Sequence, residues 1–323
     1  KLFNKIKPVG RLVLGFFGFI YDFYRYCRFS GAMSNYNNRA TRNYAVAKVY
    51  HSLEKSLSFK ERRIGAGAGE ASLLCELLEF SILNKDFGYH DRVGFEVLNK
   101  FIDEGNGLDS GVVERCESVL NEYQGISCFE GYSCGSIART KAEFFKGKLE
   151  SPEDFFNTRY SLREYSSEVV SIELVNRALA LAMKTPSACN RQPWHVYQID
   201  ERKKIDLALS FQSGNRGFGH KVPYLMIITM DLRAFVPGSE RYQHWIDGGM
   251  FSMSIIYALH SLGLASCCLN WSKLAKDDKK LREALGLKDE HSIMMMLSVG
   301  YPDELNKLCV SPRRPFDEII TKI

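Results

Sequence analysis

Residues 248–272 read GGMFSMSIIYALHSLGLASCCLNWS, a stretch without a single Asp, Glu, Lys or Arg. Serines and Asn270 interrupt the apolar run and Gly263 breaks it, so a membrane span is not expected here. The pattern predicts a helix over 249–262 that is buried on all sides, followed by a short buried strand over 265–269. Both sides of such a helix must pack against other protein elements, and a second subunit can supply one of these packing surfaces.

The segments around this stretch alternate between helical and strand-like patterns. Residues 168–184 are amphipathic and are stopped by Pro186, which predicts a helix. Short apolar runs predict three further strands, at 194–199, 224–230 and 293–299. Strands that alternate with helices indicate an α/β or α+β catalytic domain over residues 151–323.

The first half of the chain predicts a mainly helical domain or extension over residues 1–150. Helix-length patterns separated by turn-rich stretches occur at 36–57, 71–83, 92–101, 111–123 and 137–148. His51 and Glu54 share one helical face, which most often means a local pair. The glycine-rich stretch 63–69 lacks the G-K-[ST] ending of a P-loop. A helical domain that packs on the second half is therefore favoured over a second active site.

The composition fits a folded protein without nucleic acid or metal. Of the 323 residues, 45% are hydrophobic and 25% are charged, which excludes a mostly disordered chain. The net charge of +5 does not by itself indicate a nucleic-acid binder. Nine cysteines without a C-x-x-C pair indicate reduced thiols in a cytoplasmic protein. Neither the cysteines nor the histidines show the paired spacing of a zinc site, so no metal is expected.

The basic excess belongs to the amino terminus. Six Lys and Arg residues against Asp22 give residues 1–30 a charge of +5, and the remainder of the chain is balanced. Phenylalanines interleave with these cations, which predicts an interfacial helix at a membrane surface or an assembly protein. A helix that packs on the protein is the equal alternative. The apolar part, 12–20, is too short for a bilayer span, which takes about 20 residues.

Arg159, Ser161 and Arg163 stand at every second position of one segment. If the segment is extended, all three side chains lie on one face, which suits a phosphate or another anion. On the residues alone, a surface charge cluster is the more common explanation.

The loop 186–194 lies between a predicted helix and a predicted strand and is stiffened by a proline at each end. Ser187, Asn190 and Gln192 offer hydrogen-bond donors and acceptors, so the loop can bind the edge of a planar heterocycle. A well-capped connection is the structural alternative.

Five motifs in this order resemble the nitroreductase family of flavoenzymes. They are R-x-S-x-R at 159–163, P-S-x-x-N-x-Q-P-W at 186–194, the helix at 248–264, S-V-G-Y-P at 298–302 and a basic tail before Pro315. The resemblance covers residues 151–323. It implies an α+β fold with a mixed central sheet flanked by helices, an obligate homodimer, and one FMN in each of two sites at the subunit interface.

The resemblance also implies the reaction. A reduced nicotinamide, NADH or NADPH, would pass hydride through FMN to an unidentified small-molecule acceptor. Hydride transfer is chemistry of the cofactor itself, so no catalytic side chain is expected. Two alternatives stay open. One is a flavin-dependent dehydrogenase or oxidase of a biosynthetic intermediate, and the other is a non-catalytic dimeric platform that docks at a membrane or an assembly.

By resemblance, Arg159 would hold the FMN phosphate and Arg163 would lie near the pyrimidine end of the flavin, with Ser161 in the same binding segment. The other subunit would contribute the second loop, through Ser187, Asn190 and Gln192.

The remaining implied cofactor residues lie further along the chain. Asn215 resembles the asparagine that bonds the uracil-like edge of the flavin. Arg313 resembles the carboxy-terminal phosphate arginine, and Arg314 is a candidate helper because Ser311 replaces a basic residue that is frequent in the family. Asn270 lies where many relatives carry a P-x-E-G motif over the N5 side of the flavin, so the substrate face differs.

A further resemblance concerns the helical half. The segments 50–58 and 62–67 resemble an extension of a subgroup of nitroreductase-like proteins that is associated with polysaccharide biosynthesis. This association is a prediction about the pathway and names no substrate.

Overall fold

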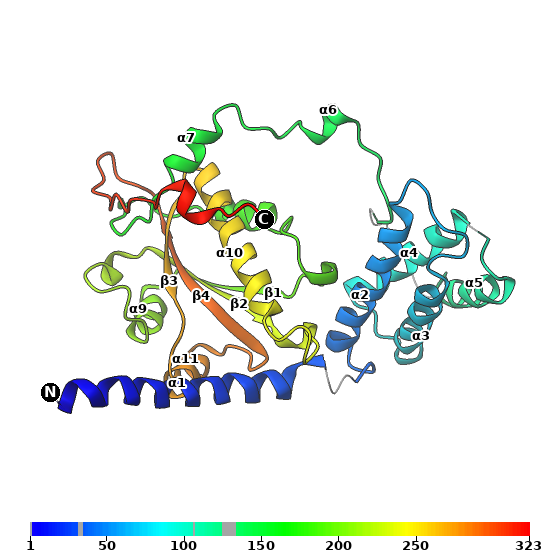
Figure 1. Cartoon of the computed structure of the whole chain (residues 1–323), viewed down its shortest axis with the longest axis horizontal. Helices are drawn as coiled ribbons and strands as arrows, with labels where there is room; N and C mark the ends of the chain where they lie inside the picture. The colour runs from blue at the N-terminus through cyan, green and yellow to red at the C-terminus, as the bar shows by residue number, and fades with distance from the viewer. Residues whose placement is uncertain (1, 32–34, 106, 125–133) are drawn as a thin grey trace.

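The computed structural model describes residues 2–31, 35–105, 107–124 and 134–323. Its carboxy-terminal part is built on a four-stranded sheet in the order β1-β2-β4-β3 (Figure 1). The strands are β1 at Trp194–Ile199, β2 at Tyr224–Asp231, β3 at Ala265–Asn270 and β4 at His291–Gly300. The four predicted strands are therefore confirmed.

All neighbouring strands in this sheet are antiparallel. The resemblance predicts a mixed sheet, and the described residues contain one isolated parallel bridge, between Ser161 and Ser266 at the β3 edge. The segment of Ser161 adds only this bridge because its neighbours turn away to form other contacts, such as the hydrogen bond from Tyr165 Oη to the carbonyl of Leu162.

Helices cover both faces of the sheet, which confirms the α+β fold (Figure 1). The helices α8 (Ile172–Ala182) and α10 (Gln243–Ser261) share a core with one face, whereas α9 (Arg202–Ser210) and α11 (Ala275–Leu285) share a core with the other. Alternate residues of β2 enter the two cores, and the whole strand is buried because neither face meets water.

The helix α10 buries only one of its sides within a single chain. Phe251, Ile255 and Leu259 enter the core, but Trp245 and Ile246 on the other side are exposed. Met250, within the predicted range, is exposed as well, so the prediction of burial on all sides is wrong for one chain, although Phe155 and Phe156 pack on Tyr257.

The amino-terminal part holds a second, separate hydrophobic core. It is formed by α2 (Arg39–Leu57), α3 (Ala68–Asn84), α4 (Tyr89–Asp103) and α5 (Ser110–Gln124). These helices confirm four of the five predicted in this half. The fifth, at 137–148, is wrong: only the short α6 (Lys141–Phe144) forms, and Ile137 and Phe145 are exposed.

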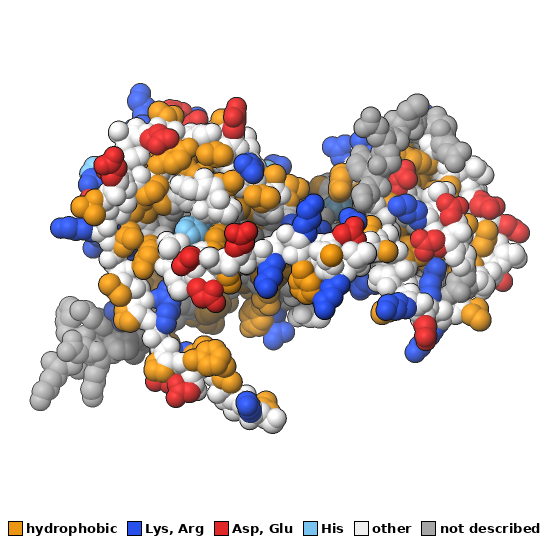
Figure 2. Space-filling view, turned by 90° about the horizontal axis from the view of Figure 1, so that it is seen from above, with side chains coloured by type: hydrophobic (Ala, Val, Ile, Leu, Met, Phe, Trp, Pro, Cys, Tyr) orange, Lys and Arg blue, Asp and Glu red, His pale blue; other side chains and the backbone are white. Residues whose placement is uncertain are grey.

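The two parts form two lobes, and charged side chains of both signs are mixed over the face shown in Figure 2. The short helices α6 and α7 (Pro152–Asn157) lie on the connection between the lobes (Figure 1). The predicted domain boundary at 150/151 falls on this connection and stays a prediction.

The helix α1 (Leu2–Phe29) lies along the carboxy-terminal lobe rather than the helical lobe (Figure 1). Tyr26 of α1 enters the core beside α10, and Arg25 is buried. Within the described ranges, none of the helices is both long and apolar enough to cross a membrane.

Candidate functional site

The segment with Arg159, Ser161 and Arg163 lies along the free edge of β3. Ser161 bridges Ser266, and the amide of Leu162 donates to the Ser266 carbonyl at 3.1 Å. Leu162 is buried while Arg163 is exposed, so the backbone is extended here as predicted. The apolar side chain holds the segment on the sheet, and the polar ones are left available for a ligand.

A cavity of about 230 Å³ opens beside this segment and is lined by Arg159, Tyr160, Leu162, His260 and Leu264 among others. His260 Nε2 is placed by the Phe155 carbonyl at 3.0 Å and by Thr158 Oγ1 at 3.2 Å. A guanidinium group at the wall of a cavity suits a phosphate, which arginine binds through paired N–H donors.

The far end of β3 is joined to the loop that carries Asn215. Gln212 is buried, and its Nε2 donates to the Asn270 carbonyl at 2.5 Å. Its Oε1 accepts from the amides of Ser213 and Gly214, at 2.6 and 2.8 Å. Gln212 therefore holds the Asn215 loop beside Asn270. The sequence analysis missed this role because the two residues are far apart along the chain.

Asn215 and Asn270 themselves remain accessible. Asn215 is half-buried and donates from Nδ2 to the Leu209 carbonyl at 3.3 Å, and Asn270 is exposed at the end of β3. Both predicted residues thus lie at the same edge of the sheet as Arg163.

The carboxy-terminal tail passes close to this edge. Arg163 Nη1 lies 3.6 Å from the sulfur of Cys309. Arg313 and Arg314 are exposed further along, and Arg313 donates to the carbonyl of its neighbour Ser311. The tail is therefore near the arginine segment at Cys309, and the phosphate role of the two tail arginines stays a prediction.

The second predicted loop has an unusual backbone. Cys189, Asn190 and Gln192 all have positive φ angles, of 52°, 52° and 51°. Ser187 Oγ accepts from the Gln192 amide at 3.0 Å, and Gln192 Nε2 donates to Asn190 Oδ1 at 3.3 Å. These conformations are costly for residues other than glycine and persist where surrounding contacts enforce them, often at functional sites.

Arg191 is the residue that fixes this loop. Its side chain is buried, and its guanidinium forms two 2.9 Å hydrogen bonds to the carboxylate of Glu240 and one of 2.6 Å to the Ala234 carbonyl. Burial alone would raise the pKa of Glu240, but the hydrogen bonds from Arg191 and from the Val236 amide outweigh it and lower that pKa.

Asp247 of α10 gives the loop a second support. It accepts from the Ala188 amide at 3.1 Å and from Gln243 Nε2 at 2.7 Å. Burial raises the pKa of Asp247 above its ordinary value, although both hydrogen bonds oppose this effect. The helical lobe also reaches the loop, because α2 packs against Ala188–Asn190.

The two predicted segments lie at opposite corners of the sheet in one chain. The loop leads into β1 at Trp194, which pairs with Met230 of β2, and Met230 in turn pairs with Ser292 of β4. Ser266, beside the arginine segment, pairs with Val299 of β4. Ser292 and Val299 are seven residues apart along β4, which is a distance of roughly 23 Å along the strands. The strands β1 and β3 are three strand spacings apart, which is roughly 14 Å across the sheet. One chain therefore does not bring Arg159 and Asn190 together.

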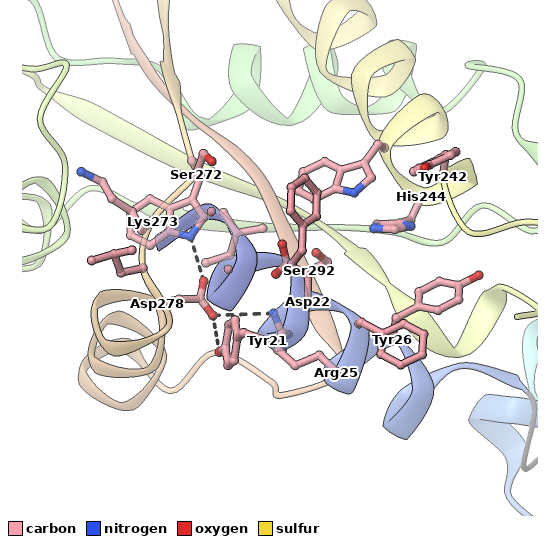
Figure 3. A pocket seen from close by; sticks show the side chains of 18 of the residues that line it. Tyr21, Asp22, Arg25, Tyr26, Tyr242, His244, Ser272, Lys273, Asp278 and Ser292 are labelled. Atoms are coloured by element: carbon pink, nitrogen blue, oxygen red, sulfur yellow. Dashed lines mark hydrogen bonds and ion pairs between the residues drawn. The ribbon is translucent and has the colours of Figure 1, made fainter. Parts of the chain in front are cut away.

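A larger cavity, of about 590 Å³, lies between α1 and the carboxy-terminal lobe (Figure 3). His244 lines it, and its Nδ1 is buried without a hydrogen-bond partner among the described atoms. Burial, and next the charge of Arg25, lower the pKa of His244 to about 4, so the ring is neutral at pH 7. The cavity is lined by none of the predicted cofactor residues.

Within the described chain, no group of three or more His, Cys, Asp or Glu could hold a metal ion.

Comparison with known proteins identifies the family. The sequence profile of the nitroreductase family matches residues 157–216 and 209–301. A relative from Archaeoglobus fulgidus, provisionally named an NADH dehydrogenase/NAD(P)H nitroreductase, is 30% identical over 154 residues, which are 46% of this chain and 83% of the relative. The chain belongs to the nitroreductase family.

The relatives of this nitroreductase-family chain differ in their named activities. An iodotyrosine deiodinase from Nematostella vectensis is 22% identical over 212 residues, covering 57% of this chain and 76% of the relative. A crystal structure described as a nitroreductase in complex with FMN, from Desulfovibrio desulfuricans, matches with 22% identity and a TM-score of 0.47, covering 54% of this chain and 98% of that chain. The profile match and the Archaeoglobus fulgidus relative confirm the family resemblance, and the link to polysaccharide biosynthesis stays a prediction.

Proposed function

We propose that this protein is an FMN-dependent oxidoreductase that takes hydride from NADH or NADPH and passes it to a small-molecule acceptor. The observation that carries the proposal is the β3 edge, where the arginine segment, the Asn215 loop and Asn270 lie along one strand. Membership of the nitroreductase family and the name of the Archaeoglobus fulgidus relative support this reaction and the nicotinamide donor.

The residues at this edge fit FMN in chemical type. Arg159, beside the smaller cavity, would hold the phosphate, with Arg313 and Arg314 reaching it from the tail. Arg163 stands four residues further along an extended segment, roughly 13 Å away, and would reach the ring instead. Asn215 and Asn270 would offer amide groups to the polar edges of the ring. Bound FMN would supply the hydride chemistry, and these residues would hold and orient it.

The functional unit in this proposal is a homodimer. The loop with Ser187, Asn190 and Gln192 would come from the second subunit, since in one chain it lies at the opposite corner of the sheet. The exposed side of α10, with Trp245 and Ile246, offers the apolar surface that such a subunit would cover. We place the protein in the cytoplasm, a proposal supported by the free thiols of the described cysteines.

The absorption spectrum of the purified full chain, reconstituted with FMN and freed of unbound flavin, tests the function. We expect a retained yellow chromophore that NADH or NADPH bleaches in the absence of oxygen. A chromophore that neither nicotinamide bleaches would favour the dehydrogenase or oxidase alternative. A colourless but folded protein would contradict the flavin proposal and favour the non-catalytic platform.

Arg163→Gln and Arg313→Gln should separate redox tuning from cofactor retention. Two-electron reduction places negative charge near N1 of the flavin, and a nearby cation favours the reduced state. Arg163→Gln should therefore lower the midpoint potential by some tens of millivolts, since roughly 30 mV corresponds to about 1.4 kcal/mol. Arg313→Gln should weaken FMN retention and leave the potential unchanged, because the phosphate charge is the same in both states. Potentiometric titration at saturating FMN measures both, and equal shifts would contradict the assignment.

A further inference from the structure

The outward side of α1 is apolar and exposed. Leu12, Phe16, Phe19 and Phe23 follow one another at intervals of four and three residues, which places them on one side of an α-helix. Phe16, Phe19 and Phe23 are 61%, 77% and 67% exposed, and their neighbours Phe17 and Ile20 are exposed as well. An apolar strip of this size on a soluble lobe marks an interaction site.

The opposite side of α1 fixes how the helix lies. The carboxylate of Asp278 in α11 accepts hydrogen bonds from Tyr21 Oη and from Trp271 Nε1, each at 2.8 Å, and lies 3.6 Å from the guanidinium of Arg25 (Figure 3). Arg25 also donates to the carbonyls of Asp289 and His291, at 2.6 and 3.0 Å. Because these polar side chains face the protein and are bonded there, Phe16 faces away from it, and Phe19 and Phe23 lie at the open rim of the cavity beside α1, where both remain largely exposed.

Cations flank this apolar strip. Arg11 and Arg28 are exposed on α1. The sequence places Lys5 and Lys7 in the same helix. Asp22 is the one acidic residue of α1, and burial raises its pKa. This charge pattern complements an anionic surface rather than a neutral one.

The position of α1 suits a flat partner. The helix runs along one edge of the molecule: in Figure 1 it lies at the bottom with α11 at the same level, and the sheet lies above both. Its 28 residues span roughly 42 Å at about 1.5 Å per residue. A plane at this edge would contact α1 along its length, with α11 beside it. The face shown in Figure 2, seen from the opposite side, carries charges of both signs instead.

We propose that α1 docks this protein on the surface of an anionic membrane, with the helix axis in the plane of the interface. The aromatic side chains would enter the boundary between headgroups and acyl chains, while the flanking cations contact anionic lipid headgroups. Asp278, through Tyr21 and Arg25, would hold the lobe on the helix. The inference goes beyond the oxidoreductase activity and needs no bound flavin.

Flotation of the full chain with lipid vesicles tests this docking. Wild-type protein should float with vesicles that contain phosphatidylglycerol at low salt, and less with pure phosphatidylcholine or at high salt. The variant Phe16→Ser/Phe19→Ser/Phe23→Ser should lose at least about tenfold in binding, because it removes exposed apolar area from the contact face. Arg11→Gln/Arg28→Gln should reduce the dependence on salt.

A matched control changes exposed apolar residues elsewhere. Ile64→Ser/Leu83→Ser/Val169→Ser removes three side chains that are 84%, 79% and 88% exposed, and it should float like wild type. Thermal melts of each variant separate lost docking from unfolding. Failure of wild type to float with phosphatidylglycerol vesicles at low salt would overturn the proposal. So would a Phe16/Phe19/Phe23 variant that floats normally, or one whose only change is the oligomeric state, since α1 would then contact protein.

Discussion

Replacing Arg191 with leucine is expected to lower the free energy of unfolding by roughly 3–5 kcal/mol, the range for breaking a buried ion pair on one side. The guanidinium is 1% exposed and pairs with Glu240 at 2.9 Å, so its removal leaves a partly buried carboxylate without a counter-charge. The Ala234 carbonyl also loses its side-chain donor, and the Ala188 carbonyl keeps only the backbone amide of residue 191. Urea denaturation followed by circular dichroism measures the change.

The double variant Arg191→Leu/Glu240→Leu serves as the first control. Replacing both charges avoids the unpaired carboxylate, so part of the lost stability should return. Lys204→Ala is the second control, because it breaks an exposed pair with Glu201 and should cause no resolvable change. A single Arg191 variant as stable as wild type would show that the pair does not anchor the loop.

The strands could be predicted from sequence because the sheet is covered on both sides. All eight residues of β2 are buried, so the strand is a continuous apolar run with clear ends. The helices α9 and α11 were not predicted from the sequence, because both lie at the surface and contribute only a few apolar residues, such as Ile205 and Leu281, to the core. Conversely, the segment 137–148 has a helical pattern, but its described side chains stay exposed and only a short helix forms.

The same reasoning separates the site residues. The alternation of Arg159, Ser161 and Arg163 is visible in the sequence, and the structure shows it as an extended edge segment. The role of Arg191 is not visible, because an arginine in a polar loop is usually exposed. Only the fold brings it to Glu240, 49 residues away. The orientation of α1 likewise depends on Asp278, more than 250 residues away from Tyr21.

Hybrid dimers that carry Arg159→Ala in one chain and Asn190→Gly in the other should bind FMN at about half of their sites. If each site takes Arg159 from one subunit and Asn190 from the other, one site of the hybrid combines both wild-type residues. The second site combines both substitutions. Glycine is chosen at position 190 because the backbone there has a φ of 52°, which glycine adopts without strain.

The hybrid distinguishes a shared site from a site within one chain. If Arg159 and Asn190 acted in the same chain, every site of the hybrid would carry one substitution, and FMN binding would match the weak binding of the two parent homodimers. Co-expression with two different affinity tags isolates the hybrid, and the flavin absorbance per dimer gives the occupancy. A second hybrid, in which the Arg159→Ala chain meets an Arg159→Ala/Asn190→Gly chain, contains no intact site under either arrangement and sets the background. Binding of the first hybrid at this background would exclude the shared site, and the opposite corners of the sheet would then have to be bridged by a movement within one chain.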